Sequence, residues 1–236
     1  RMNVRTEAEV VHVEQDADGV SVIAQDVRSG QECTFKVERL MTAVGRRSNA
    51  DLLRVENAGL VLDERGYLRV NEYLETGVEN VWAFGDITGG HMFTHVANEE
   101  AAVAWHNSTH EQRAAMDYRA IPHAVFGHPQ IAAVGLTEEQ ARREHDILVG
   151  KVPYTKAPKG EAMMETDGFA KAIVDGKSGR ILGFHIIGPY APILIQEVIN
   201  ARATGGGTNS IDAGLHIHPA LPELVTRTLR SLRTPD

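Results

Sequence analysis

The stretch FAKAIVDGKSGRILGFHII (residues 169–187) holds two apolar runs on either side of Gly176-Lys177-Ser178-Gly179. Short apolar runs bounded by glycine-containing turns are typical of β-strands, so this stretch predicts strands over 169–174 and 180–187. The neighbouring sequence predicts further strands at 123–125, 131–135 and 147–153 and helices at about 191–203 and 222–232. A sheet with its helices gathered on one side is an α+β architecture.

Two more helices are expected upstream of this stretch. Thr137-Glu138-Glu139-Gln140 is a capping-box pattern, and it opens a helix that runs to about His145. Apolar residues recur at helical spacing from Thr94 to about Gln112, which predicts the clearest helix of the first half. We expect a boundary between two parts of the chain near residues 115–117.

The first residues predict a small meander of strands. Asp18-Gly19 lies between two β-branched runs, which is a strong hairpin signal, and Arg28-Ser29-Gly30 makes a second turn. An apolar run over 40–44 then predicts a more buried strand. Between this run and the helix at Thr94, we expect a short helical turn from Leu52 and strands near 67–70 and 81–84.

Composition places the chain among ordinary globular proteins. It has 236 residues, 42% of them hydrophobic, and a formal net charge of −8. That balance is too apolar for a disordered chain, and the acidic charge without a Lys/Arg block argues against a nucleic-acid partner. The single cysteine, Cys33, rules out a disulfide framework and reads as a structural thiol, and no apolar run approaches membrane-spanning length. We expect a cytoplasmic protein without a membrane partner.

One candidate site lies in the segment NVWAFGDIT (residues 80–88). Its apolar run ends in Gly85-Asp86, and a helix begins a few residues later, near His95. A carboxylate at the C-terminal edge of a strand can hold a ligand hydroxyl, and a helix N-terminus favours negative charge. A turn-forming Asp that caps a loop gives the same pattern. The residues alone leave both interpretations open.

A second candidate site is HIHPALPE (residues 216–223), in which Glu223 follows His218 across a proline turn into a helix. If Glu223 accepts a hydrogen bond from one ring nitrogen of His218, the tautomer is fixed and the other nitrogen is left as a base. A solvated His before a proline-started helix, with Glu223 favourable in the first turn, is the alternative.

These segments occur in one order in a single family, and the chain resembles the C-terminal part of the FAD-dependent pyridine nucleotide–disulfide oxidoreductases. VGRRSN (44–49) is similar to the strand that leaves the family's NAD domain, with Ser48 where a proline is usual. AFGDIT (83–88) resembles its second flavin motif, and IAAVGLTE (131–138) resembles the start of its dimerisation domain. The resemblance implies three parts: the end of an NAD-binding domain (1–46), the C-terminal part of an FAD-binding domain (47–116) and a dimerisation domain with an antiparallel sheet (117–236).

The resemblance also implies roles for individual residues. Asp86, with Gly85, contacts the ribityl chain of FAD, and His95-Val96-Ala97 form the helix start that faces the flavin ring. His218 and Glu223 match the family's catalytic pair, in which the His exchanges a proton with a thiol at the active site of the other subunit. The implied cofactors are FAD and NAD(H) or NADP(H), and the implied partners are a second subunit in a homodimer and a small disulfide or dithiol substrate.

Two features of the family are missing from this sequence. The family carries a Cys-x4-Cys dithiol and G-x-G-x-x-G fingerprints, whereas this chain has one cysteine and no such glycine pattern. We therefore expect a fragment of about half a reductase, inactive alone. The resemblance points first to dihydrolipoamide dehydrogenase, with a mycothione- or glutathione-type disulfide reductase as the alternative.

Two other classes of function compete with this interpretation. His91 and His95, and separately His106 and His110, are spaced to share a helix face, but no Cys or carboxylate completes a zinc set, and we expect no metal site. A non-catalytic dimerisation module would explain the missing dithiol without a longer protein. Such a module has no need for the His218–Glu223 arrangement.

Overall fold

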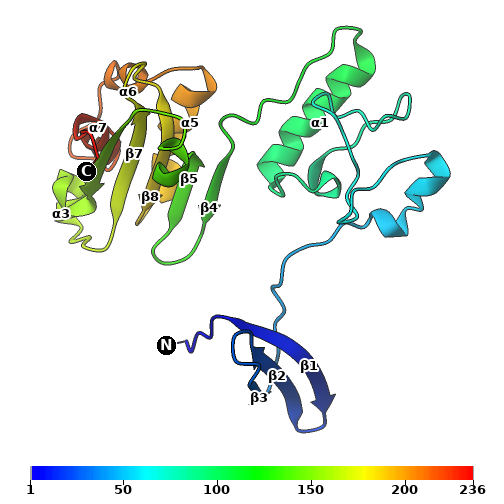
Figure 1. The fold of residues 1–236 in the computed structure, drawn as a ribbon. Coiled ribbons are helices and arrows are strands. Elements are labelled where there is room, and N and C mark those ends of the chain that lie inside the picture. The colour runs from blue at the N-terminus through cyan, green and yellow to red at the C-terminus, as the bar shows by residue number, and fades with distance from the viewer. Residues whose placement is uncertain (1, 236) are drawn as a thin grey trace. The chain divides into compact units, whose positions relative to one another are not determined.

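A computed structural model describes residues 2–235, so the outer limits of the predicted domains, Arg1 and Asp236, lie outside the described residues. The chain divides into two compact units, residues 1–47 and 48–236. In the first unit, β1 (Ala8–Asp16), β2 (Gly19–Asp26) and β3 (Glu32–Val37) form an antiparallel sheet in the order β1-β2-β3. The predicted meander is confirmed (Figure 1).

The predicted buried strand over residues 40–44 is wrong. These residues form no strand, and Met41 and Val44 are almost fully exposed. An apolar run becomes a strand only where a neighbouring strand pairs with its backbone, and the described sheet of this unit ends at β3. Cys33, which the sequence indicated as a structural thiol, lies in β3, but its thiol is exposed rather than packed in a core.

The first part of the second unit is built mostly from turns. The short helices η1 (Ala50–Leu52), η2 (Val55–Ala58) and η3 (Gly85–Thr88) precede the long helix α1 (Thr94–Thr109). The helix predicted from Thr94 is confirmed, although it ends three residues early. The strands predicted near 67–70 and 81–84 shrink to single bridges, Leu62–Leu68 and Glu75–Trp82, because tight turns on either side leave room for one pair each.

The last part of the second unit is the predicted antiparallel sheet. Its five strands have the order β4-β5-β8-β7-β6 and are bounded as follows: β4 Pro122–Val125, β5 Ile131–Gly135, β6 Ile147–Pro153, β7 Phe169–Asp175 and β8 Ile181–Ile187. All the predicted strands of this part are confirmed. The stretch 169–187 is the central hairpin, with Phe169 opposite Ile187.

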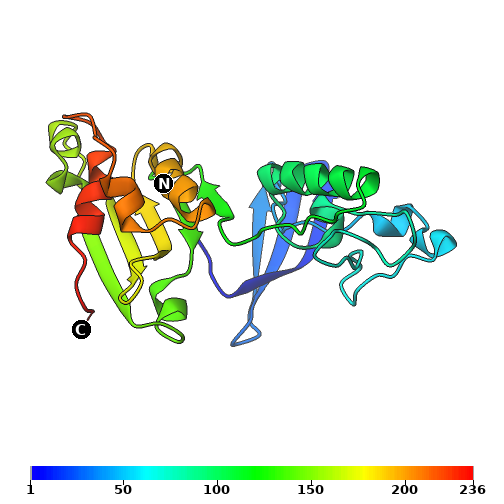
Figure 2. The same ribbon diagram turned by 90° about the horizontal axis from the view of Figure 1, so that it is seen from above.

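Helices cover the sheet mainly on one face. The helices are α2 (Glu138–Ala141), η4 (Tyr154–Lys156), α3 (Pro158–Ala162), α4 (Ala191–Leu194), α5 (Gln196–Ala203), α6 (Thr208–Asp212) and α7 (Glu223–Arg230). Residues of α4 to α7 pack with Ala172, Val174 and Phe184 in the main core, and Figures 1 and 2 show these orange-to-red helices beside the strands. The α+β architecture is confirmed, with the short α2 adding a smaller core on the opposite face.

The capping box predicted at the start of α2 is present. The Thr137 hydroxyl accepts from the Gln140 amide, and the Gln140 side chain accepts from the Thr137 amide at 2.9 Å. The helix it opens is shorter than predicted, ending at Ala141 rather than near His145. Within residues 2–235, no helix combines the length and the apolar character needed to cross a bilayer.

The close packing of the sheet gives a first testable prediction, at Gly183 in β8. A Cβ at this position would lie 1.9 Å from the backbone oxygen of Leu136, which cannot move aside without disturbing the chain after β5. We expect Gly183→Ala to lower the free energy of unfolding by about 1–3 kcal/mol, as for overpacked cores. Urea unfolding of the chain measures the loss, and Gly127→Ala is the control because its Cβ would meet only an ordinary contact at 3.5 Å.

Candidate functional site

The Gly85-Asp86 turn is the first element of the site. Gly85 has the left-handed backbone angle φ of +74°, and a Cβ there would lie 3.3 Å from the Ala97 side chain of α1. The Thr88 hydroxyl donates to the Gly85 carbonyl at 2.8 Å and closes the turn. A glycine is therefore favoured where the turn leaves residue 84 and approaches the helix.

A buried carboxyl group holds this turn, and the sequence prediction missed it. Glu100 of α1 is 2% exposed; its Oε2 accepts from the Gly85 amide at 2.6 Å and its Oε1 accepts from the Tyr118 hydroxyl at 2.7 Å. Burial, followed by the bond to Glu100, raises the pKa of Tyr118. The signal was present in the sequence, since Glu100 is spaced by four residues from both Val96 and Ala104 on the buried face of α1.

The start of α1 is the second element. Val96 is buried, whereas His95 is exposed and its Nε2 lies 3.0 Å from the Pro122 carbonyl oxygen. The residue before the helix, Phe93, provides no side-chain cap, and its carbonyl accepts from the Val96 and Ala97 amides. The Thr94 and His95 amides and the positive end of the helix dipole can therefore interact with an electron-rich group. A cavity of about 650 Å³ lies beside this helix start, lined by Phe93, His95 and His123 among others.

The His218–Glu223 pair is the third element, in the loop that leads into α7. The His218 Nδ1 lies 3.0 Å from the Glu223 Oε1, and the other carboxylate oxygen accepts from the Ala220 amide at 3.1 Å. The imidazole is 67% exposed, whereas the carboxylate is 13% exposed. A carboxylate on Nδ1 assigns the proton to that nitrogen, which leaves Nε2 as the basic atom of the ring.

The hydrogen bond with His218, with smaller help from the Ala220 amide and from Arg227, lowers the pKa of Glu223. The stabilisation from this lowered pKa is present above the ordinary value of 4.5 and is lost as pH falls through the lowered value. We expect Glu223→Gln to reduce stability at pH 7 and to make much less difference at pH 3. Urea unfolding at the two pH values measures this, and an equal loss at both would contradict it.

The structure brings two of the three elements together. Gly85 packs against Ala97 and is bonded to Glu100, so the turn and the helix start form one unit. In the described chain, the side-chain hydrogen bonds and ion pairs of His218 and Glu223 stay within residues 218–227. The His218–Glu223 pair therefore belongs to a separate surface of this chain.

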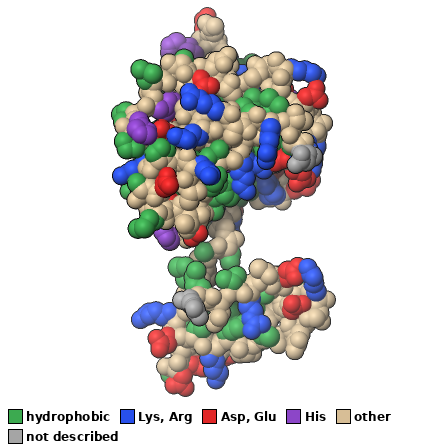
Figure 3. Space-filling model, turned by 90° about the vertical axis from the view of Figure 1, so that its left-hand side faces the viewer, with side chains coloured by type: hydrophobic (Ala, Val, Ile, Leu, Met, Phe, Trp, Pro, Cys, Tyr) green, Lys and Arg blue, Asp and Glu red, His purple; other side chains and the backbone are tan. Residues whose placement is uncertain are grey.

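The histidines considered as metal ligands have other partners. His91 precedes α1, so it does not share a helix face with His95, and its ring lies 5.4 Å from that of Tyr118. His106 and His110 stack on each other at 4.4 Å. Across residues 2–235, no three His, Cys, Asp or Glu side chains gather closely enough to hold a metal ion. Figure 3 shows histidine and hydrophobic side chains close together on one face of the larger unit.

Comparison with known proteins identifies the family. Residues 1–101 match the family model described as pyridine nucleotide-disulphide oxidoreductase, and residues 121–229 match its dimerisation domain. The chain is 40% identical to the mycothione reductase of Mycobacterium tuberculosis over 99% of its length and 51% of that protein's. It is 36% identical to the dihydrolipoyl dehydrogenase of Corynebacterium glutamicum, over 90% of the chain and 46% of that protein.

A solved structure agrees with these matches. The flavoprotein disulfide reductase RclA from Escherichia coli, as a Cu(II) complex, superposes with a TM-score of 0.81 at 30% identity, covering 94% of this chain and 49% of that one. The chain thus spans about half the length of the relatives that it matches. Two family models in tandem and a shared fold confirm the resemblance, and the chain belongs to the pyridine nucleotide–disulphide oxidoreductase family.

Proposed function

We propose that this chain works within an FAD-dependent NAD(P)H:disulfide oxidoreductase, to which it supplies flavin contacts, a subunit interface and a proton-transferring pair. The observation that carries the proposal is the His218–Glu223 hydrogen bond, which leaves an exposed and basic Nε2 on a fixed ring. The alternative, a non-catalytic dimerisation module, would not explain why the Glu223 carboxylate is hydrogen-bonded to an exposed imidazole. We keep the predicted boundaries near residues 46 and 116 as part of this proposal.

The Gly85-Asp86 turn and the start of α1 fit a flavin nucleotide. The family uses FAD and a pyridine nucleotide. The left-handed Gly85 brings the backbone close to α1, and Asp86 follows it at the start of η3. We propose that the Asp86 carboxylate accepts from a ribityl hydroxyl. Val96 and Ala97, with His95, present the helix start to the flavin ring. When bound, FAD carries electrons between the nicotinamide and the disulfide.

His218 has a defined task in such an enzyme. Reduction of a disulfide by two electrons needs two protons and yields two thiols, and in the reverse direction a thiol must lose its proton before it attacks. Nε2 of His218 is the atom that we propose exchanges this proton, while Glu223 holds Nδ1–H and stabilises the charged ring. The pair acts by orientation, because the carboxylate also bonds the Ala220 amide and cannot turn freely.

The histidine lies on a surface suited to contact another subunit. Leu215 and Ile217, on either side of His216, are 103% and 80% exposed. Exposed apolar side chains around a catalytic group are typical of surfaces that a partner covers. We propose that a homodimer buries this surface and brings His218 to the flavin and dithiol of the partner.

The substrate that we propose is a small disulfide or dithiol. Lipoamide is the first candidate, and mycothione is the second because the relative with 40% identity is a mycothione reductase. The test is steady-state turnover by the full-length FAD-loaded protein, with NADH or NADPH, on lipoamide, mycothione and glutathione disulfide. We expect turnover of at least one small disulfide. Flavin reduction by the pyridine nucleotide without reduction of any of these disulfides would overturn the proposal.

A further inference from the structure

The loop that carries His218 has few attachments to the rest of the chain. Within the described chain, residues 215–219 make no backbone hydrogen bond to another element. Leu215 and Ile217 point away from the core and are almost fully exposed. Neither apolar packing nor a strand or helix ladder therefore fixes where this loop lies, and the position of His218 depends on side-chain contacts.

The neighbouring histidine makes the contact that is needed. His216 is only 15% exposed, and its Nε2 lies 2.8 Å from the Glu197 Oε2 of α5. Its Nδ1 lies 3.3 Å from the Gly214 carbonyl oxygen, so both ring nitrogens are engaged. A single residue, Ile217, separates the histidines of two His–carboxylate pairs, and their exposure is opposite: His216 is turned inward to the protein body and His218 is turned outward.

The partner of His216 is firmly placed. Glu197 lies in α5, whose residues Val198 and Ala201 are buried in the main core of the sheet. The second carboxylate oxygen of Glu197, Oε1, is buried and has no hydrogen-bond partner among the described residues. The Glu197 side chain is 30% exposed, and its side-chain hydrogen-bond partner among the described residues is His216. Removal of His216 would leave this partly buried carboxylate without that partner, which costs stability.

We propose that Glu197 and His216 are positioning residues, which anchor the 215–219 loop to α5 and so set the place and direction of the His218 ring. The inference rests on the proposed role of His218 in proton transfer. A displacement of about 1 Å at a reacting group can cost about 100-fold in rate, so an anchor of this kind controls turnover without touching substrate. Glu223 orients the ring within the loop, and Glu197 orients the loop on the protein.

The test is a double-mutant cycle in the full-length FAD-loaded protein, with turnover of the disulfide substrate as the readout. We expect His216→Ala and Glu197→Ala each to lower kcat by about 10- to 100-fold. The rate of flavin reduction by the pyridine nucleotide should stay unchanged in both. In a His218→Ala background, His216→Ala should cause no further loss, because it acts through His218. Glu197→Ala lies outside the loop and tests the same pair if His216→Ala fails to fold.

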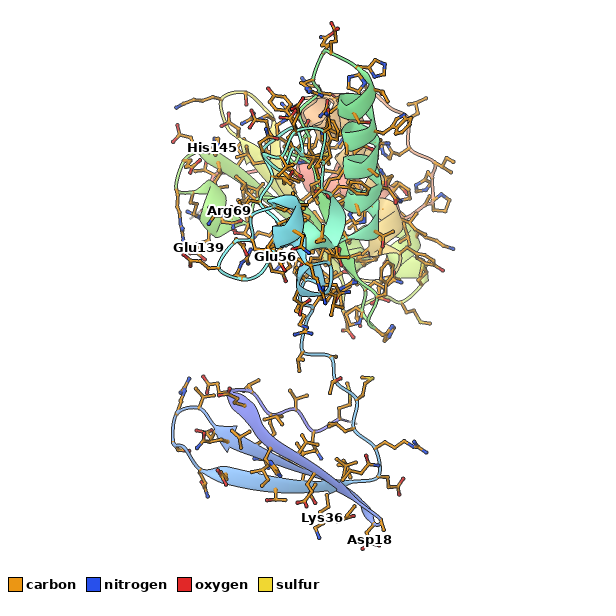
Figure 4. All side chains as sticks on the ribbon, turned by 90° about the vertical axis from the view of Figure 1, so that its right-hand side faces the viewer. Asp18, Lys36, Glu56, Arg69, Glu139 and His145 are labelled. Atoms are coloured by element: carbon orange, nitrogen blue, oxygen red, sulfur yellow. The ribbon has the colours of Figure 1, made fainter. Side chains whose placement is uncertain are left out.

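The matched control is His145→Ala. His145, labelled in Figure 4, forms a similar half-buried pair with Asp175 at 3.1 Å, remote in sequence from the 215–219 loop. Its loss should leave kcat within about twofold, as for a change outside the site. Unchanged kcat in His216→Ala and Glu197→Ala, or an equal further loss in the His218→Ala background, would overturn the anchor while the proposed function stands. Unchanged kcat in His218→Ala itself would overturn both.

Discussion

Replacement of His218 by alanine in the full-length FAD-loaded protein lowers disulfide turnover by about 10²- to 10⁴-fold, the range for loss of a general acid–base group. The Nε2 atom is the exposed and basic nitrogen of the ring, and its partner nitrogen is held by Glu223 at 3.0 Å. Flavin reduction by NADH or NADPH needs no thiol proton, so its rate stays at the wild-type value. Stopped-flow absorbance of the flavin and steady-state turnover separate the two half-reactions.

His128 provides the matched control for this experiment. It is an exposed histidine followed by a proline, as His218 is, but among residues 2–235 it has no carboxylate partner. His128→Ala should therefore leave turnover within about twofold of wild type. Glu223→Gln should give a smaller loss than His218→Ala, because the ring remains but its tautomer is no longer fixed. Wild-type turnover by the His218→Ala protein would refute the assigned role.

Replacement of Glu100 by alanine lowers the free energy of unfolding by about 2–4 kcal/mol, because it leaves a buried amide unpaired and opens a cavity. The amide is that of Gly85, which donates to Glu100 at 2.6 Å. The turn that carries Asp86 loses its anchor on α1, so the full-length protein should also retain less FAD. Urea unfolding of the chain and the ratio of flavin to protein absorbance measure the two effects.

Three variants separate the causes of this loss. Glu99→Ala changes the exposed neighbour on the same helix and should alter stability by less than about 0.5 kcal/mol. Tyr118→Phe removes the other donor to Glu100 and should cost less than Glu100→Ala, because Gly85 keeps its acceptor. Glu100→Gln keeps an acceptor for Gly85 and should retain FAD. Full FAD content in Glu100→Ala would show that the turn does not depend on this carboxyl group.

The parts of the fold that could be predicted from the sequence are those specified by local patterns. The central hairpin follows from two apolar runs around a glycine turn, and the capping box at Thr137 is readable from four letters. The five-residue helices α3 and α6 are too short to show helical periodicity, so the sequence did not reveal them. At residues 40–44 the error is the opposite one: a strand was predicted where none forms. An apolar run does not show whether a neighbouring strand is present to pair with it.

The candidate site divides in the same way. Gly85-Asp86 and the His218–Glu223 pair could be singled out by their residue types and spacing, and the family resemblance then supplied the roles that the residues alone left open. Glu100 was missed because a glutamate on a helix is ordinarily solvated, and only its spacing from Val96 marks it as buried. Glu197 and His216 could not be paired from sequence, because they are 19 positions apart and the path of the loop decides their contact.

The two bonds of Glu100 also link segments that are distant in the chain. The same carboxyl group receives the Gly85 amide and the Tyr118 hydroxyl, and Tyr118 lies just before β4, in the connection to the five-stranded sheet. Release of that connection would therefore loosen the Gly85 turn as well. The rate of amide hydrogen exchange at Gly85 therefore reports how often the connection detaches, and it can be measured without substrate, cofactor or turnover.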